Sequence, residues 1–128
     1  MSQATAPEER PTVLVVDDEE DLRDIMRRML ERRGFTTLIA GDSQQAIAVC
    51  REHPGDIDVL VTDLGLPGVS GGELSRTAAE LRPQMQVIYI SGLPREIAVA
   101  DGLIAEDALL VKKPFSTDRL IEALRSVL

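Results

Sequence analysis

Short runs of apolar residues alternate with longer amphipathic segments five times along this chain. An unbroken aliphatic run is typical of a strand buried on both faces, and apolar residues three or four positions apart are typical of a helix with one buried face. The predicted strands are 13–16, 35–40, 59–61, 87–90 and 108–111. Strands that alternate with helices form right-handed βαβ units, so the pattern predicts an α/β fold, a doubly wound five-stranded parallel sheet with helices on both faces.

The amphipathic segments predict one helix after each strand. The second helix is expected to cover 43–52, and the fourth is expected within 94–106, although Gly102 disfavours a helix interior. Ser116 or Thr117 can cap the fifth helix. The residues predicted to face the core from these helices are Leu22, Ile25, Met26, Met29, Leu30, Ala46, Val49, Cys50, Leu74, Ala78, Leu81, Leu120, Ile121, Leu124, Val127 and Leu128.

Length and composition indicate one globular domain. The chain has 128 residues, which is enough to bury a core. Residues 1–11 contain two prolines and show no periodicity, so we expect a disordered lead-in there and a single domain at 12–128. The formal net charge is -8 and no basic stripe is present, so direct binding of nucleic acid is not expected.

The same features predict a cytoplasmic protein. Cys50 is the one cysteine, which excludes an intramolecular disulfide, and its place in a helical pattern indicates a small buried thiol. No apolar run approaches the about 20 residues of a membrane span, and no secretory signal precedes the first strand. We therefore expect neither membrane insertion nor secretion.

Polar side chains follow four of the five predicted strands, at the point where each strand ends. They are Asp17 and Asp18 after the first strand, Asp63 after the third, Ser91 after the fourth and Lys113 after the fifth. In an open parallel sheet, ligands bind outside the carboxyl ends of the strands. Taken singly, Asp18 could cap the first helix, Ser91 could be a turn hydroxyl and Lys113 a solvated loop lysine. Their joint occurrence at one edge favours a shared site.

The charges of these residues predict what the site binds. The three acids bring three negative charges and Lys113 brings one positive charge, and carboxylates this close raise one another's pKa unless a cation joins them. All the donors are hard oxygens, which selects Mg²⁺ or Mn²⁺ over zinc. Such a site supports phosphoryl transfer to a carboxylate. Asp63 would attack, the metal and Lys113 would neutralise charge, and the Ser91 hydroxyl would hold a phosphoryl oxygen.

The motifs at the strand ends are Asp17-Asp18, Asp63 within Asp-Leu-Gly-Leu-Pro-Gly, Ile90-Ser91-Gly92 and Lys113-Pro114-Phe115. As an ordered set they resemble the receiver domains of two-component response regulators, in the single-domain form of the chemotaxis regulators. The resemblance runs from about residue 12 to the C-terminus. It implies the flavodoxin-like strand order 2-1-3-4-5, a phosphorylation-activated signalling switch rather than an enzyme, and a cis peptide bond between Lys113 and Pro114.

The resemblance also implies a role for each site residue. Asp63 would accept the phosphoryl group from a histidine kinase or a histidine phosphotransfer protein. Mg²⁺ would be ligated by Asp18, Asp63 and the backbone carbonyl of Gly65, with Asp17 acting through water. Lys113 would pair with the phosphoryl group. A downstream protein target is expected on the face formed by the fourth helix, the fifth strand and the fifth helix.

Two positions depart from the pattern of this family. Leu110 lies three positions before Lys113, where receivers often carry an aromatic switch residue, so an aromatic flip cannot be the readout. Ser91 stands where threonine is common. Serine keeps the hydroxyl but loses the methyl group that restricts the rotamer, so we expect the function to be kept and the coupling to be softened.

Single features argue against two alternative functions. An aspartate-nucleophile phosphatase of the haloacid dehalogenase type needs an acid two residues after the nucleophile, where this chain has Gly65. A nucleotide-binding module needs a glycine-rich cradle after the first strand, where this chain has the acidic run 17–21. A receiver-like module that binds partners without phosphorylation stays open, and so does a piece cut from a hybrid kinase or a larger regulator.

Overall fold

The computed structural model describes residues 10–66 and 68–128. Five parallel strands form one sheet in the order β2-β1-β3-β4-β5, which confirms the predicted fold class and strand order. The strands are β1 (Thr12–Val16), β2 (Thr36–Ala40), β3 (Val59–Asp63), β4 (Gln86–Ser91) and β5 (Leu109–Lys112). The helices are α1 (Glu20–Arg32), α2 (Ser43–Glu52), α3 (Gly71–Leu81), α4 (Arg95–Ala100) and α5 (Thr117–Val127). In the described part of the chain, none of these helices is long and apolar enough to cross a bilayer. Of the predicted lead-in at 1–11, residues 1–9 lie outside the described residues.

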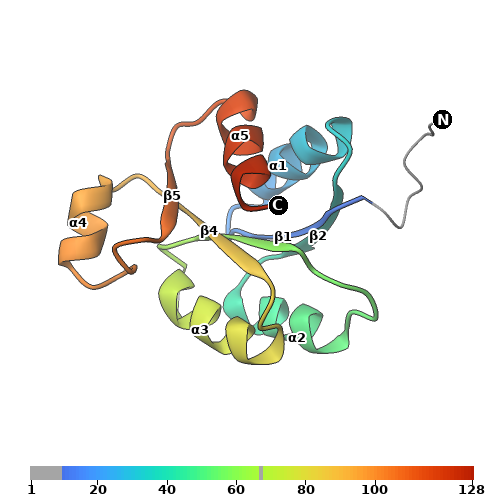
Figure 1. Ribbon diagram of the computed structural model, residues 1–128, viewed down its shortest axis with the longest axis horizontal. Helices are drawn as coiled ribbons and strands as arrows, with labels where there is room; N and C mark the ends of the chain where they lie inside the picture. The colour runs from blue at the N-terminus through green and yellow to red at the C-terminus, as the bar shows by residue number, and fades with distance from the viewer. Residues whose placement is uncertain (1–9, 67) are drawn as a thin grey trace.

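The helices cover both faces of the sheet, as Figure 1 shows: α1 and α5 lie on one face, α2 and α3 lie on the other, and α4 lies beside the edge strand β5. Successive side chains of a strand point to opposite faces. Val13 and Val15 of β1 therefore join the core beneath α1 and α5, and Leu14 and Val16 join the core beneath α2 and α3. This double burial explains why the central strands are unbroken aliphatic runs.

Three helices begin at a residue whose side chain caps the first turn. The Ser116 hydroxyl accepts a hydrogen bond from the amide of Arg119, so the predicted cap of α5 is confirmed. Asp42 and Ser70 cap α2 and α3 in the same way. Each such bond satisfies an amide that has no partner inside the helix, and replacing a cap by alanine typically costs about 1 kcal/mol. The caps fix where the helices begin relative to the strand ends.

The fourth helix is shorter than the predicted range 94–106. It covers Arg95–Ala100 and closes in a Schellman arrangement, in which the amides of Gly102 and Leu103 donate back to carbonyls of the last turn. Gly102 has a φ of 72°, a left-handed conformation that glycine adopts without a steric penalty. Gly102 therefore ends α4, and the chain runs on as a loop to β5.

Three residues that the apolar stripes predicted to face the core are exposed instead. Ile25, Leu81 and Leu128 are 49%, 37% and 53% exposed. On α1 the buried stripe is centred on Met26 and Leu30, and Ile25 lies outside it. Leu81 is the last residue of α3, and Leu128 follows the last residue of α5. At these helix ends the described part of the chain leaves both side chains largely open to solvent.

Candidate functional site

The carboxyl ends of four strands bring the predicted site residues to one edge of the sheet. Asp17 directly follows β1, Asp63 is the last residue of β3, Ser91 is the last residue of β4, and Lys113 directly follows β5. The parallel register pairs Asp63 with Ile90, the residue before Ser91. All the polar residues that the sequence predicted at the carboxyl ends of the strands therefore lie at that end of the sheet.

The three acids form a compact cluster. Asp17, Asp18 and Asp63 each offer a carboxylate oxygen, and these oxygens all lie within 4.8 Å of one another. The Asp17 side chain is buried and its Oδ1 accepts a hydrogen bond of 2.8 Å from the amide of Glu19. Glu19 is the N-cap residue of α1 and makes no side-chain cap bond. The alternative interpretation of Asp18 as the helix cap is therefore wrong, and the exposed Asp18 carboxylate faces the cluster.

Lys113 points into this cluster rather than into solvent. Its Nζ lies 2.9 Å from Asp63 Oδ2 and 3.9 Å from Asp17 Oδ2, so the interpretation of a solvated loop lysine is wrong. Burial alone would lower the pKa of Lys113, but the hydrogen bond to Asp63 and the nearby negative charges outweigh it and raise that pKa. The ammonium group is therefore charged at neutral pH. The predicted cis peptide bond between Lys113 and Pro114 is confirmed.

Both carboxylate oxygens of Asp63 are held by neighbouring groups. Oδ1 accepts a hydrogen bond of 2.9 Å from the amide of Gly65, and Oδ2 accepts the bond from Lys113. These two bonds fix the plane of the carboxylate at the end of the strand. The role of the Gly65 carbonyl as a metal ligand stays a prediction.

The Ser91 side chain lies at the end of β4 and is buried. Its Oγ accepts a hydrogen bond of 3.0 Å from the amide of Leu93, so here it is the turn hydroxyl of the simpler interpretation. An accepting hydroxyl still has its own hydrogen to donate. Ser91 can therefore hold the turn and donate to an oxygen at the site at the same time.

The residues of the cluster fit a divalent cation. Burial raises the pKa of Asp17; the Glu19 amide and Lys113 lower it, the charges of Asp63 and Asp18 raise it again, and the net pKa lies above the usual value. The three acids of the cluster also carry more negative charge than Lys113 neutralises. Mg²⁺ prefers oxygen ligands, and these acids supply nothing else. Asp18 and Asp63 offer the accessible oxygens, and Asp17 lies deeper.

Comparison with known proteins gives the family. The model of the response regulator receiver domain matches residues 13–125. The chain belongs to this family. Receiver domains of two-component response regulators are signalling switches rather than enzymes. They bind Mg²⁺ at an acidic cluster, here Asp17, Asp18 and Asp63, and they interact with histidine kinases or phosphotransfer proteins.

The relatives of this receiver domain include transcriptional regulators and isolated receivers. The C4-dicarboxylate transport transcriptional regulatory protein DctD of Rhizobium meliloti is 32% identical over 90% of this chain and 25% of its own. A receiver domain structure from Clostridium thermocellum is 27% identical, has a TM-score of 0.81 and covers 91% of this chain and 93% of its own. A Burkholderia pseudomallei response regulator, solved with a phosphorylated aspartic acid, a calcium ion and citrate, is 26% identical, with a TM-score of 0.77, and covers 89% of this chain and 66% of its own. The chain spans between 12% and 50% of the length of three curated relatives that it matches.

Asp17→Asn is expected to stabilise this receiver domain at neutral pH when divalent metal is absent. The folded pKa of Asp17 lies above its ordinary value of 3.8, so the folded state binds the proton more tightly, and stability falls as the pH rises through the folded pKa. Asparagine does not ionise, so the variant does not lose stability in this way. Its side-chain oxygen can still accept the hydrogen bond from the Glu19 amide. Thermal unfolding in EDTA at pH 7 measures the effect, and a gain of about 1 kcal/mol would raise the Tm by about 4 °C. Mg²⁺ should then stabilise the wild type more than the variant, which lacks one of the three negative charges; equal stabilisation would contradict the prediction.

Two contacts of the receiver domain were not predicted from the sequence. Arg23 Nη1 donates to the backbone carbonyl of Asp17 at 2.9 Å. The hydroxyl of Tyr89 lies 2.6 Å from the Ser75 Oγ on α3, and its ring packs in the cluster beneath α4. Tyr89 is paired in register with Leu110, so the aromatic ring of this region stands on β4 instead of β5. The alternation of side chains along β4 places Tyr89 on the same face as Ser91, and this was the feature of the sequence that could have predicted the position of the ring.

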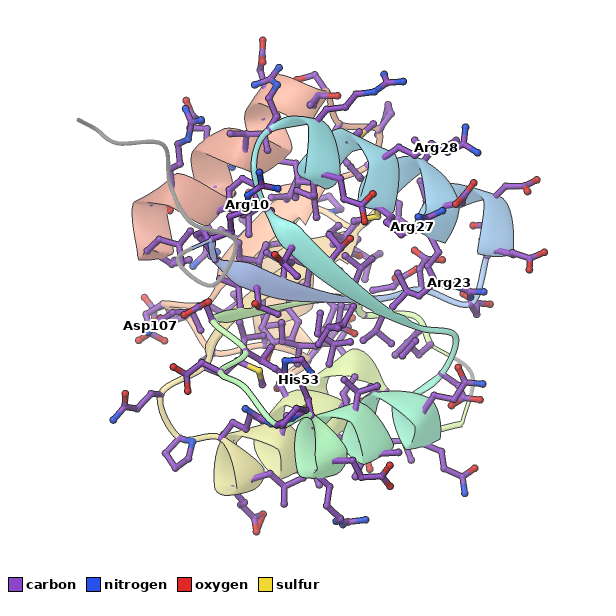
Figure 2. The ribbon with its side chains drawn as sticks, turned by 90° about the vertical axis from the view of Figure 1, so that its right-hand side faces the viewer. Arg10, Arg23, Arg27, Arg28, His53 and Asp107 are labelled. Carbon is purple, nitrogen blue, oxygen red and sulfur yellow. The ribbon has the colours of Figure 1, made fainter. Side chains whose placement is uncertain are left out.

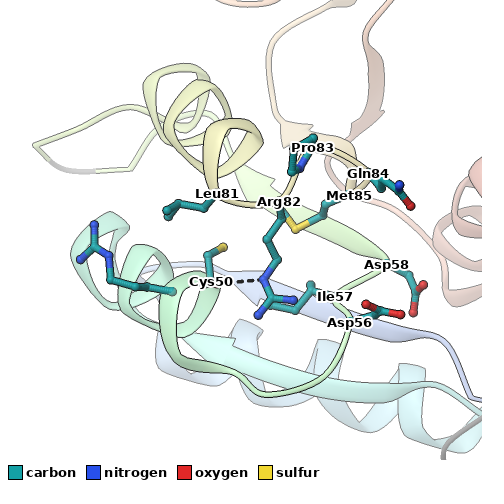
Figure 3. A pocket seen from close by; sticks show the side chains of 10 residues that line it. Cys50, Asp56, Ile57, Asp58, Leu81, Arg82, Pro83, Gln84 and Met85 are labelled. Carbon is teal, nitrogen blue, oxygen red and sulfur yellow. Dashed lines mark hydrogen bonds between the residues drawn. The ribbon is translucent and has the colours of Figure 1, made fainter.

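A polar cavity of about 550 Å³ lies at the opposite end of the sheet, next to the residues that precede β3 and β4 (Figure 3). The guanidinium group of Arg82 points into it and donates to the carbonyls of Cys50, His53 and Gly55 at 2.8, 2.6 and 2.6 Å. Arg82 thus ties the end of α3 to the end of α2. None of the predicted site residues lines this cavity.

Proposed function

We propose that Asp63 is the phosphoacceptor of this receiver domain and that a divalent cation at the acidic cluster supports the transfer. The observation that carries the proposal is the setting of the Asp63 carboxylate, which lies 2.9 Å from the Lys113 ammonium and beside Asp17 and Asp18. The Burkholderia pseudomallei relative with a phosphorylated aspartic acid and a calcium ion supports it. A carboxylate that is oriented and flanked by a cation is suited to attack phosphorus.

The cation would be held by the side chains of Asp18 and Asp63 and the carbonyl of Gly65, with Asp17 acting through a water molecule. Mg²⁺ is the proposed cation, and Mn²⁺ can take the same oxygen ligands. When bound, it neutralises negative charge on the phosphoryl oxygens. The grouping of three carboxylates around one ammonium group supports this assignment, because the acids carry more negative charge than Lys113 neutralises.

The reaction moves a phosphoryl group from the imidazole nitrogen of a phosphohistidine to an oxygen of Asp63. The P–N bond breaks as the O–P bond forms, and the histidine nitrogen leaves with the electron pair and takes up a proton. Because this transfer depends on positioning and charge more than on proton transfer, the chain needs no general base. Gly65 and Lys113 orient the carboxylate, and Lys113 and the Ser91 hydroxyl then bind phosphoryl oxygens. Attack of water on the acyl phosphate releases phosphate and restores Asp63.

The phosphorylated form would signal through the face of α4, β5 and α5. Leu93, Ile97 and Leu103 lie on or beside α4 and are exposed large apolar side chains, which suits contact with a protein partner. Because Leu110 excludes an aromatic flip, we propose that backbone shifts near Ser91 and rearrangement of the short α4 carry the signal. The phosphoryl donor is a histidine kinase or a histidine phosphotransfer protein, and the compartment is the cytoplasm.

Phosphorylation by acetyl phosphate tests this function. In Mg²⁺, the wild type is expected to gain the mass of one phosphoryl group, and Asp63→Asn is expected to gain none, because an amide is not nucleophilic enough to attack. Intact-protein mass spectrometry measures the gain. Asp56→Asn is the matched control, since Asp56 is an exposed acid at the far end of the sheet; it should behave as the wild type.

Two outcomes would overturn the assignment. A wild type that gains no mass in Mg²⁺ would favour a receiver-like module that binds partners without phosphorylation. An undiminished gain in Asp63→Asn would place the phosphoryl group on another residue. Beryllofluoride binding, which also needs Mg²⁺ and the Asp63 carboxylate, gives an independent readout that does not depend on the lifetime of the acyl phosphate.

A further inference from the structure

Arg23 reaches back from the first turn of α1 to the loop that carries two acids of the cluster, Asp17 and Asp18. Its Nη1 donates to the Asp17 carbonyl at 2.9 Å, and the side chain is half-buried. Figure 2 shows the labelled Arg23 between the start of α1 and the end of β2. The guanidinium group therefore joins the helix to the residue that follows the first strand, which is itself a member of the cluster.

Gly41, in the loop after β2, leaves the space that the guanidinium group occupies. A Cβ at Gly41 would lie 3.0 Å from Arg23 Nη1 and 3.6 Å from its Cζ. The φ of Gly41 is not left-handed, so its backbone conformation does not require glycine. A Cβ at this position would therefore press on the guanidinium group, and it would also lie 3.4 Å from Gln45 Oε1. The loop is itself held by the bond from the Gly41 amide to Gln45 Oε1 at 2.8 Å.

We infer that Arg23, seated over Gly41, is a positioning residue for the divalent cation site. Asp17 is held at three points: its amide donates to the Ala40 carbonyl at 3.2 Å, its carboxylate accepts from the Glu19 amide at 2.8 Å, and its carbonyl accepts from Arg23. The bond from Arg23 is the one that a side-chain substitution can remove. Asp18 follows directly, so the same bond limits how far the Asp18 carboxylate can move from Asp63. A metal site whose ligands are held in place before binding loses less freedom when the ion binds.

The inference rests on the proposed function, because it assumes that the acids bind a cation. It also predicts that removing Arg23 changes the cation affinity in the direction opposite to the one that electrostatics alone would give. A guanidinium group near the cluster repels a cation, so removing its charge would tighten cation binding if charge were all that mattered. If Arg23 positions the acids, removing it weakens binding in spite of the lost repulsion. Outer groups that orient metal ligands typically contribute 10-fold or more to affinity.

The test is a calorimetric titration of the full chain with Mg²⁺. Arg23→Ala and Gly41→Val, which would displace the guanidinium group, are each expected to weaken Mg²⁺ binding by about tenfold. The double variant should be no weaker than either single one, because both remove the same contact. Arg28→Ala is the control: it removes the same charge from the same helix, but Arg28 is exposed and pairs with Asp24. It should bind Mg²⁺ as tightly as the wild type or slightly more tightly.

A second readout is the Mg²⁺ concentration that gives half-maximal phosphorylation by acetyl phosphate, which should rise by the same factor in both variants. Equal or tighter Mg²⁺ binding by Arg23→Ala would overturn the inference while leaving the proposed function intact. Failure of the wild type to bind Mg²⁺ would instead overturn the proposed function. If Arg23→Ala does not fold, Gly41→Val tests the same contact with the arginine still present.

Discussion

Replacing Gly71 with alanine is expected to destabilise the domain by about 3 kcal/mol, the upper part of the range for overpacked sites. Gly71 is the first residue of α3, and a Cβ there would lie 2.4 Å from the carbonyl oxygen of Asp63 and 3.1 Å from the Cα of Leu64. Both neighbours are backbone atoms, so no change of rotamer relieves the contact. Either the helix withdraws or the end of β3 moves.

Movement of β3 would also displace Asp63, so Gly71→Ala is expected to weaken Mg²⁺ binding together with stability. Urea unfolding and Mg²⁺ titration measure the two effects. Gly55→Ala is the matched control, because a Cβ there meets only the His53 ring at 3.4 Å. Its free energy of unfolding should change by no more than about 0.5 kcal/mol. If Gly71→Ala were as stable as this control, the close contact between α3 and β3 would not exist in solution.

Lys113→Met is expected to uncouple cation binding from the response to phosphorylation. The ammonium group lies 2.9 Å from the Asp63 carboxylate, so it is placed to bind a phosphoryl group on Asp63. Without it, the acids lose a competing cation, so Mg²⁺ binding should tighten. The phosphorylated or beryllofluoride-bound form should then fail to shift the structure, because its negative charge has no lysine to bind. Calorimetry and the NMR spectrum of the backbone amides measure these two changes.

The same substitution should lower the free energy of unfolding by about 1.5 kcal/mol at neutral pH, since it removes one charge-assisted hydrogen bond that is partly exposed to solvent. The pKa of Lys113 is raised above 10.5 in the folded state. The stabilisation that the charged Lys113 provides is therefore fully present below pH 10.5, and it is lost as the pH rises through the folded pKa. Lys112→Met, at the exposed neighbouring position, is the control. Identical behaviour of the two variants would show that the contact with Asp63 has no energetic role.

Much of the fold could be predicted because the central strands are buried on both faces. The aliphatic runs around Val15 and Val61 mark their strands, and the strand ends then place Asp17 and Asp63 at one edge. This inference needs only the topology of a parallel sheet. The predicted range of α2, about 43–52, agrees with the structure, in which the Asp42 side chain caps the start of the helix.

Contacts that depend on side-chain direction could not be predicted. The bond from Arg23 to the Asp17 carbonyl needs the guanidinium group to turn toward the sheet, and nothing in the sequence spacing specifies this. The end of α4 was visible as Gly102, but a glycine can lie within a helix or end it, and the choice depends on backbone bonds formed only in the fold. Ile25 was misplaced because helical periodicity does not give the width of the buried stripe.

Tyr89 has a practical consequence for the study of this protein. It is the single tyrosine of the chain, and the chain has no tryptophan. The intrinsic fluorescence therefore comes from one phenol, placed between α3 and the cluster beneath α4 and hydrogen-bonded to Ser75. A ligand that alters that bond is expected to change the emission of the unlabelled protein, so the tyrosine reports on this part of the fold without a label.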